Sequence, residues 1–352
     1  MRRHETEKGD SDRLEPIRDS QSDGNSHYAH SAEGLRSPNA SSGPDPGRGP
    51  GEVIPFIRDF PVRYGEAEAV SPLIRRVTAR NPGPFTFTGT GTYIVGRDHP
   101  GATVAVIDPG PADDLHLAAL LGALNGRTVS HILVTHTHRD HAPLARPLAT
   151  ATGAVILAAP PLTRPHDTAV AIDEDDDDDF RPDRILADGE IVAGDGWTLE
   201  TLATPGHASN HLAFVLREEN ALFSGDHVMG WSTTVVAPPD GDMVAYMQSL
   251  DAVIARDFTT LWPTHGAPVT DPGPFLRAYR DHRLAREAQI LARLDAGDRT
   301  IATMVPRLYA AVDDRLWPAA SLSVLAHLIK LVAEGRVVAE PAATLGATYR
   351  PG

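Results

Sequence analysis

Three histidines and one aspartate fall within a stretch of six residues: His136, His138, Asp140 and His141. The apolar run at 132–134, which has the composition of a buried strand, comes shortly before them. Imidazole is the commonest protein ligand for zinc-like ions, and alternate side chains of an extended segment point the same way, so His136 and His138 can bind one ion. The chain then turns, which lets Asp140 and His141 face a neighbouring position. The spacing predicts a metal site with room for two ions and a bridging water.

Three later strand-like segments each lead to a residue of a ligand type. These segments are 197–202, 222–225 and 261–264. The first is followed by His207, the second by Asp226 and the third by His265. We expect these three strand ends to converge on the site at 136–141 and to supply the ligands that it lacks.

The order His-x-His-x-Asp-His, Gly-His, Gly-Asp and His-Gly resembles the signature of the metallo-β-lactamase superfamily over roughly residues 85 to 270. The resemblance implies an αββα sandwich, in which two mixed β-sheets lie between helices and the site lies at one edge of the sheets. It also implies two groups of metal ligands with one shared residue. The first group would be His136, His138 and His207, the second Asp140, His141 and His265, and Asp226 would bridge them.

The chain contains no cysteine, which restricts the subclass of the superfamily that it can resemble. Antibiotic-hydrolysing members of the first subclass use a cysteine ligand where this chain has Asp226, so β-lactamase activity is not expected. Two divalent ions are implied, with Zn²⁺ as the expected metal. Mn²⁺ and Fe²⁺ are alternatives, because ligand sets of oxygen and nitrogen are less selective than thiolate sets.

Two residues near the site each have two interpretations. Asp108 follows a strand-like apolar run, and the resemblance implies that it accepts a hydrogen bond from a ligating histidine and fixes its tautomer. The alternative is a turn residue that only ends the strand. His211, four residues after His207, resembles the second histidine of several hydrolase branches of the superfamily. It would be catalytic if it faced the substrate, and structural if it packed behind His207.

Length and composition favour about two domains with a large core, since the chain has 352 residues of which 41% are hydrophobic. Residues 1–50 are rich in Ser, Gly, Pro, Asp and Arg, which predicts a disordered tail that is either merely solvated or regulatory. The catalytic domain is expected at 51–272, and a linking helix with a small domain at 273–352. The acidic run 173–179 is expected to be a solvated loop or a loop at the mouth of the site.

Two strands, at 85–88 and 92–95, are expected to be joined by a glycine-rich turn, with a buried strand following at 104–107. No apolar run approaches the roughly 20 residues that span a bilayer, so no membrane association is expected. The amino terminus has arginines without an apolar stretch behind them, which argues against a secretory signal. A cytoplasmic protein is therefore expected.

The carboxyl-terminal part has the pattern of a small helical domain. Residues 275–294 have helical composition, a helix begins at 301–305, and Gly335 and a possible wing strand at 336–340 follow a second helix. The apolar stripe of that second helix is Val324, Leu325, Leu328, Ile329 and Val332. The order resembles the winged-helix module of the β-lactamase-like protein 2 branch, which also contains endoribonucleases.

The expected activity is hydrolysis of a small-molecule ester, thioester or lactone, as in the glyoxalase II-like members that the ligand set resembles. Asp140 or Asp226 is expected to accept or relay the proton. Glyoxalase II itself is disfavoured, because no basic and aromatic cluster in the carboxyl-terminal part is typical of a glutathione site. A non-catalytic metal-binding protein is a further alternative, but structural zinc sites close their shell with four ligands.

Cleavage of single-stranded RNA is the other enzymatic alternative, suggested by the winged helix. Arginines recur three residues apart on the helix at 275–294, at Arg277, Arg280, Arg283 and Arg286. They form either a nucleic-acid face or a solvated face with local ion pairs. A formal net charge of −15 argues against RNA, because proteins that bind nucleic-acid backbones usually show a basic footprint.

Overall fold

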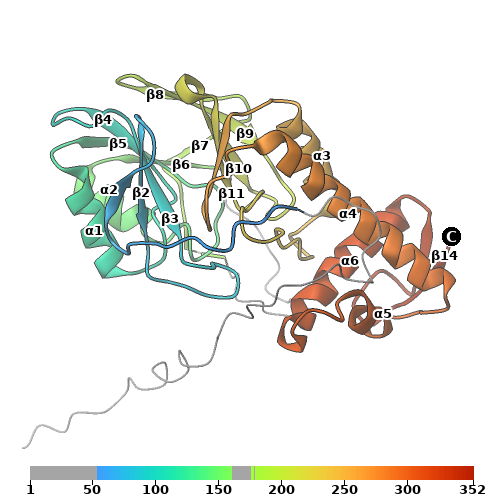
Figure 1. The fold of residues 1–352 in the computed structure, drawn as a ribbon. Coiled ribbons are helices and arrows are strands. Elements are labelled where there is room, and N and C mark those ends of the chain that lie inside the picture. The colour runs from blue at the N-terminus through green and yellow to red at the C-terminus, as the bar shows by residue number, and fades with distance from the viewer. Residues whose placement is uncertain (1–53, 161–175, 178) are drawn as a thin grey trace, which may run out of the picture. The chain divides into compact units, whose positions relative to one another are not determined.

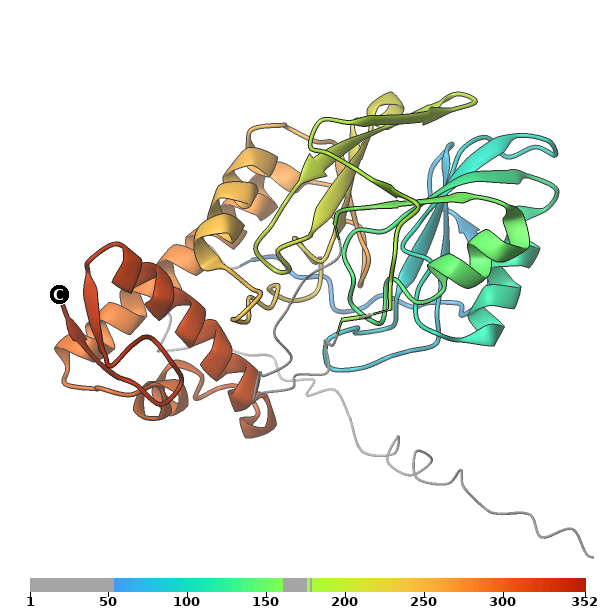
Figure 2. The same ribbon diagram turned by 180° about the vertical axis from the view of Figure 1, so that it is seen from behind.

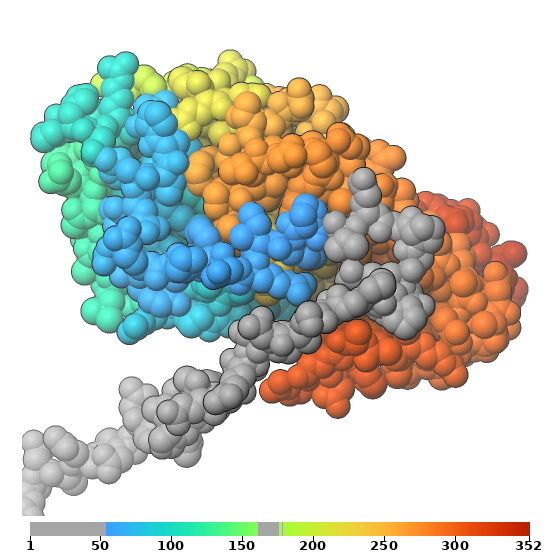
Figure 3. All heavy atoms as spheres, viewed as in Figure 1, coloured from blue at the N-terminus to red at the C-terminus, as the bar shows by residue number. Residues whose placement is uncertain are grey.

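A computed structural model describes residues 54–160, 176–177 and 179–352 of the chain (Figure 1). The predicted tail at 1–50 lies outside the described residues. So do 173–175 and 178 of the acidic run. The first described segment, 54–63, contains no helix or strand and runs across the surface toward the carboxyl-terminal helices (Figure 3). There Phe56 packs edge-on against Phe275, with ring centroids 6.1 Å apart.

Seven strands of the described residues form the first sheet, in the order β1-β2-β3-β4-β5-β6-β7. Neighbours from β1 to β4 are antiparallel, and those from β4 to β7 are parallel. The strands are β1 (Ala67–Ala69), β2 (Ile74–Thr78), β3 (Gly91–Val95), β4 (Thr103–Ile107), β5 (Thr128–Leu133), β6 (Val155–Ala158) and β7 (Arg184–Ile185).

Five more strands form the second sheet, in the order β12-β11-β10-β9-β8. Only the β11–β12 pair is parallel in this sheet. The strands are β8 (Ile191–Gly194), β9 (Trp197–Ala203), β10 (Leu212–Leu216), β11 (Ala221–Gly225) and β12 (Thr260–Pro263). A short 3₁₀ turn, Arg217–Glu219, connects β10 to β11.

Helices cover the outer face of each sheet, as Figures 1 and 2 show. They are α1 (Asp114–Leu124) and α2 (Ala145–Thr152) on the first sheet, and α3 (Met243–Ile254) and α4 (Pro272–Asp295) on the second. Strand β4 explains the layering: Val104 and Val106 pack toward the first pair of helices, whereas Ala105 and Ile107 pack between the sheets. Both faces of such a strand are buried, which is why its sequence is a continuous apolar run. The predicted αββα sandwich is confirmed.

The strand predicted at 85–88 is wrong. Residues 83–88 form a turn in which Phe87 has a left-handed backbone, with φ 55°, and β3 begins only at Gly91. The Asn81 side chain accepts from the Thr90 N–H at 2.9 Å, and this bond across the turn replaces the hydrogen bonds of a ladder. The aromatic and β-branched composition suited a strand, but the prolines and glycines around it impose the turn.

The carboxyl-terminal part contains α5 (Ile301–Leu308), a 3₁₀ turn (Asp314–Leu316), α6 (Trp317–Ala333), and the two-stranded sheet of β13 (Val337–Glu340) and β14 (Thr348–Pro351). The predicted helices and wing strand are thus present, in winged-helix order. Val324, Leu325 and Leu328 of the predicted stripe lie in the core of this part, whereas Ile329 is 38% exposed.

The expectation that no apolar run approaches membrane length needs correction. The helical segment Asp314–Ala333 is long and apolar enough to cross a bilayer, by length and composition alone, with a mean hydropathy of 1.5. Leu328 and Leu331 on this segment are fully buried in the carboxyl-terminal core, which is how the core helix of a folded domain obtains such a composition.

Helix α4 belongs to two cores. Phe275 and Tyr279 near its start pack with α3 and the second sheet, whereas Ile290 and Leu294 near its end pack with α5 and α6. Its position is therefore determined by apolar contacts at both ends.

Asp298, which is 8% exposed, joins the end of α4 to α5. It accepts from Arg293 Nε at 2.6 Å and also from Arg307. Arg293 first, and then Arg307, hold the pKa of this carboxyl below its usual value. A lowered folded-state pKa contributes stability above the unfolded value of about 4, and that stability is lost as the pH falls through the folded-state pKa.

We therefore predict that Asp298→Asn lowers the free energy of unfolding by about 1–3 kcal/mol at pH 7. The difference from the wild type should shrink as the pH falls below about 4 toward the lowered folded-state pKa of this carboxyl. Urea unfolding at pH 7 and pH 3 measures both values. Asp251→Asn, at an exposed ion pair, serves as the control with little expected effect. A loss that is equal at the two pH values would contradict the prediction.

Candidate metal centre

The seven ligand-type residues come from loops that follow four strands. Residues 136–141 follow β5, His207 follows β9, Asp226 follows β11 and His265 follows β12. The turn after β11 needs a glycine, because Gly225 has a φ of +52° and a Cβ there would lie 2.5 Å from His211 Nε2. The fold thus brings residues from 136 to 265 to one place.

His136, His138 and His207 form the first group, and all three are buried. His138 Nδ1 lies 2.9 Å from His136 Nε2 and 3.2 Å from His207 Nε2. Burial first, and then neighbouring histidines, hold the pKa of His136 and of His138 well below the usual value. Both rings are therefore neutral, which is the protonation state that binds a metal.

Asp140, His141 and His265 form the second group. Asp140 Oδ2 lies 3.0 Å from His265 Nε2 and 3.4 Å from His141 Nε2. Asp226 lies between the groups, because its Oδ2 is 3.4 Å from His265 Nε2 and 4.0 Å from His207 Nε2. All seven side chains selected from the sequence therefore lie together.

The charges of the second group fit a bound cation. Burial would raise the pKa of Asp226, but His265 and His141 hold it well below its usual value. Burial would lower the pKa of His265, but Asp226 and Asp140 raise it to about 10. The carboxylates thus draw positive charge to this place, and a divalent ion can supply it in place of protons on the imidazoles. His141 Nε2 and Asp226 Oδ1 are also buried without a hydrogen-bond partner, as unfilled ligand atoms would be.

The outward ring nitrogens have partners that orient the rings. His207 Nδ1 donates to the Val235 carbonyl at 2.7 Å, and His265 Nδ1 donates to the Gly89 carbonyl at 3.2 Å. In both rings this turns Nε2 toward the other ligand-type groups, where it can bind a metal ion in place of a proton.

Asp108 orients His141 in the same way. Its Oδ2 lies 2.9 Å from His141 Nδ1 and also accepts from the Thr264 hydroxyl at 2.9 Å. The Thr135 N–H and hydroxyl donate to the same carboxylate, at 2.8 and 2.9 Å. Of the two interpretations of Asp108, the structure shows the hydrogen-bond acceptor, because the carboxylate is fully buried and binds a ligand-type histidine.

The structure does not support a substrate-facing role for His211. Its ring is 1% exposed, Nδ1 lies 2.7 Å from the Thr204 hydroxyl, and Nε2 accepts from the Asp226 N–H at 3.1 Å. Both nitrogens are thus used within the protein, and none is left to protonate a substrate. His211 instead supports the backbone of Asp226, close to the alternative of packing behind His207.

The described part of the acidic run contacts the metal-ligand loop. Asp176 forms a β-bridge with His138, and its Oδ1 accepts from the Thr137 hydroxyl at 2.8 Å. Thr137 in turn accepts from Asn210 Nδ2 at 2.9 Å. At Asp176 the run is therefore bonded to the site loop instead of being a wholly solvated loop. Sequence reasoning missed Thr137, and no spacing signal pointed to it.

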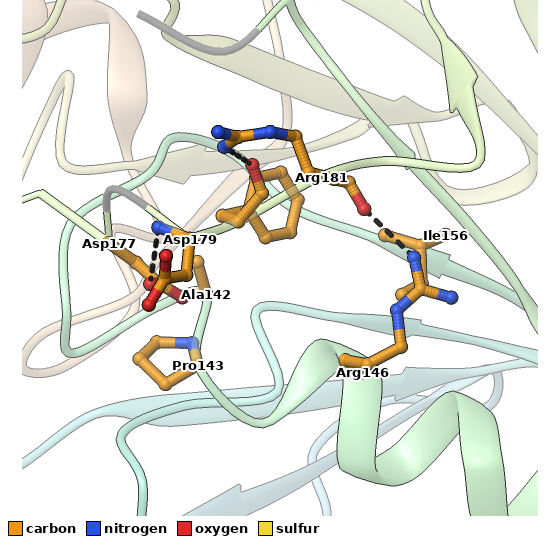
Figure 4. A pocket seen from close by; sticks show the side chains of 8 residues that line it. Ala142, Pro143, Arg146, Ile156, Asp177, Asp179 and Arg181 are labelled. Carbon is orange, nitrogen blue, oxygen red and sulfur yellow. Dashed lines mark hydrogen bonds between the residues drawn. The ribbon is translucent and has the colours of Figure 1, made fainter.

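A pocket of about 430 Å³ lies beside this contact (Figure 4). Asp177 and Asp179 line one side, and Arg146 and Arg181 line another. None of the seven ligand-type side chains lines it, although Ala142 and Pro143, which do, directly follow His141. This pocket is thus a neighbour of the candidate centre and is separate from it.

The arginines of α4 do not form one face with one role. Arg280 pairs with Asp251 at the surface, at 3.2 Å, as a solvated face would have it. Arg286 donates to the Leu308 carbonyl at 2.8 Å and stacks on a tyrosine ring. Arg283 is only 4% exposed and donates to the Thr234 carbonyl. These arginines of α4 therefore form neither a continuous nucleic-acid face nor a fully solvated face.

We predict that Asp108→Asn lowers the free energy of unfolding by about 3–5 kcal/mol, because it removes a buried charge that four donors share. Asparagine tolerates the left-handed backbone of Asp108, where φ is 49°, so the substitution leaves the backbone unstrained and removes the charge and one acceptor oxygen. Asp257→Asn is the matched control, since Asp257 has a φ of 50° and is exposed. Denaturant unfolding measures both variants, and equal losses would contradict the prediction.

Comparison with known proteins independently supports both the fold and the family resemblance. Residues 86–265 match the family model of the Metallo-beta-lactamase superfamily, and residues 300–344 match the Beta-lactamase associated winged helix domain. The chain is 35% identical over 234 residues to the atrochrysone carboxyl ACP thioesterase of Aspergillus chevalieri, which covers 65% of this chain and 68% of that protein. It is 31% identical over 280 residues to the beta-lactamase-like protein 2 homolog of Caenorhabditis elegans, covering 78% and 88%.

The fold has a solved counterpart as well. The crystal structure of a metallo-beta-lactamase family protein from Thermus thermophilus superposes with a TM-score of 0.65 at 22% identity, covering 81% of this chain and 100% of that one. With its His and Asp ligand types gathered at one place and both of its folded parts matched, the chain belongs to the metallo-β-lactamase superfamily of hydrolases.

Proposed function

We propose that this hydrolase uses a dinuclear metal centre to cleave a small thioester or ester. The observation that carries the proposal is the pair of ligand groups with Asp226 between them. His136, His138 and His207 would hold one ion, Asp140, His141 and His265 the other, and Asp226 both. When bound, two divalent ions, with Zn²⁺ as the expected metal, lower the pKa of a water between them and polarise the substrate carbonyl.

Asp226 and Asp140 are suited to move the proton of the attacking water. Asp226 lies between the two ligand groups, so one of its carboxylate oxygens would lie next to a water held there. The Asp140 side chain is 23% exposed, whereas that of Asp226 is 7% exposed, so Asp140 can pass a proton to solvent.

Thioesters are the favoured substrate class. A relative of 35% identity is named as an atrochrysone carboxyl ACP thioesterase, and the ligand types of this chain are His and Asp without a cysteine. Phe87 and Trp231 stack at 4.7 Å, and Trp231 packs against Gly266, next to His265. This half-buried aromatic pair supports an apolar acyl group beside the second ligand group.

RNA is the less favoured substrate. The winged-helix module is its main support, but Arg283 and Arg286 on α4 are used inside the protein. The net charge of −15 also opposes binding of a phosphate backbone. A purely structural metal site is disfavoured too, because the ligand types number more than the four that close a structural shell.

We predict that chelator-treated protein takes up two equivalents of zinc and that His265→Ala takes up one. The reason is that His265 belongs only to the second group. Equilibrium dialysis with metal analysis measures the stoichiometry. His99→Ala, at an exposed histidine, should still bind two equivalents. A wild-type stoichiometry of one would contradict the dinuclear proposal.

We predict that the zinc-loaded protein releases free thiol from S-lactoylglutathione or from a longer acyl thioester, and that His207→Ala reduces the rate by about 100-fold or more. A thiol-reactive dye follows the reaction. A fluorescent single-stranded RNA assayed beside it should stay intact. RNA cleavage that is lost in His207→Ala, without thioester turnover, would replace the proposed substrate class.

A further inference from the structure

We propose that Tyr279 and Arg283 of α4 are positioning residues for His207. They hold the backbone at 232–235, and the carbonyl of Val235 in that segment orients the His207 ring. The proposal rests on the metal-dependent function proposed above, because it concerns how one ligand of the first group is presented. It gives the carboxyl-terminal module a part in the centre without any contact with the substrate.

The ring of His207 depends on one backbone carbonyl. Its Nδ1–H donates to Val235 O at 2.7 Å, which places Nε2 toward His138 Nδ1, 3.2 Å away. If Val235 O moved, the ring could rotate or change tautomer, and Nε2 would no longer point at the first group. Partners of this kind commonly change metal affinity or activity by about 10–100-fold when they are removed.

The segment that carries Val235 has no regular structure of its own. Between β11 and α3, residues 226–242 form neither helix nor strand, so no ladder holds their backbone groups. Such groups need side-chain partners when they are buried. Thr234 and Val236, on either side of Val235, are both fully or nearly fully buried.

Tyr279 supplies much of this support through one hydroxyl. The hydroxyl donates to the Ser232 carbonyl at 2.7 Å and accepts from the Thr234 N–H at 2.8 Å. The Met229 N–H also points to it, at 3.4 Å. One donor and two acceptor positions are thereby all used, so the hydroxyl is fully committed to this segment.

Arg283 binds Thr234 as well, through the backbone carbonyl. Its Nη2 donates to the Thr234 carbonyl, and its guanidinium lies 5.0 Å from the centre of the Tyr246 ring. The side chain is buried, and in the described part of the chain no carboxylate forms an ion pair with it. A buried cation without an anionic partner is costly, so packing alone does not account for an arginine here.

Thr234 connects Tyr279 and Arg283 to two of the ligand-type residues, His207 and Asp226. Its hydroxyl donates to the Asp226 carbonyl at 2.8 Å, while the next residue, Val235, accepts from His207. Because α4 is held by two cores, the position of Thr234 depends on the carboxyl-terminal core as well as on the second sheet. The helix therefore links the winged-helix module to His207 and Asp226.

Tyr279→Phe tests the proposal, since it removes the hydroxyl and keeps the ring in the core. Competition with a chromogenic chelator should show that zinc binding to one of the two sites weakens by about 10–100-fold. Tyr349→Phe is the matched control: Tyr349 is also fully buried and donates one hydroxyl, to the Thr344 carbonyl at 2.6 Å, but it lies in the carboxyl-terminal core. It should unfold at a lower denaturant concentration and bind both ions with wild-type affinity.

Arg283→Lys and Arg283→Met give a second test that does not depend on Tyr279→Phe folding. Lysine keeps the charge and a hydrogen-bond donor. The zinc affinity of Arg283→Lys should therefore lie between that of the wild type and that of Arg283→Met. Wild-type affinity in Tyr279→Phe and in Arg283→Met would overturn the positioning role, even if the wild type hydrolyses thioesters. Absence of zinc binding by the wild type would overturn the proposed function itself, and the positioning role with it.

Discussion

The buried carboxylate of Asp108 is the interaction on which the candidate centre depends most. It receives hydrogen bonds from Thr135, which follows β5, from Thr264, which follows β12, and from His141 of the ligand loop. One charged group thus ties a strand end of each sheet to a ligand-type ring. A buried carboxylate is stable only when hydrogen-bond donors replace the water that it has lost. The bonds that stabilise Asp108 in this way also fix the orientation of His141.

The same rule applies to the other rings. His207 and His265 donate their outer nitrogen to backbone carbonyls, of Val235 and of Gly89, and those carbonyls lie in turns with no ladder to hold them. Side chains hold both segments: Asn81, just before the turn at 83–88, bonds across that turn, and Tyr279 and Arg283 of α4 hold the segment at 232–235. Ligand orientation is therefore a property of the whole fold, although the ligands themselves lie on a few loops.

The difference between ligands on a few loops and orienting contacts from the whole fold explains what could be predicted from the sequence. The ligand types could be found because metal binding needs few residue types at short spacing. Strands buried on both faces could be found because they contain continuous apolar runs, as β4 does from residue 104 to 107. The side chains at 85–88 suit both a strand and a turn, whereas the surrounding prolines and glycines and the bonds of Asn81 favour the turn. The environment of His211 depends on the Asp226 backbone, and that of Arg283 on Thr234, 49 residues away along the chain. Such long-range contacts leave no local pattern.

The fate of the α4 arginines bears on what the winged helix does here. A module that reads nucleic acid exposes its cations, because they must meet phosphates. In this chain Arg283 is buried against Thr234, Arg286 is used on the Leu308 carbonyl, and Glu287 is buried between Lys330 and Arg336 at 2.7 and 2.5 Å. Arg283 is thus used between α4 and the segment at 232–235, whereas Arg286, Lys330 and Arg336 are used in contacts within the carboxyl-terminal part. That arrangement suits a module whose task is to keep α4, and through it the segment at 232–235, in place beside the metal ligands.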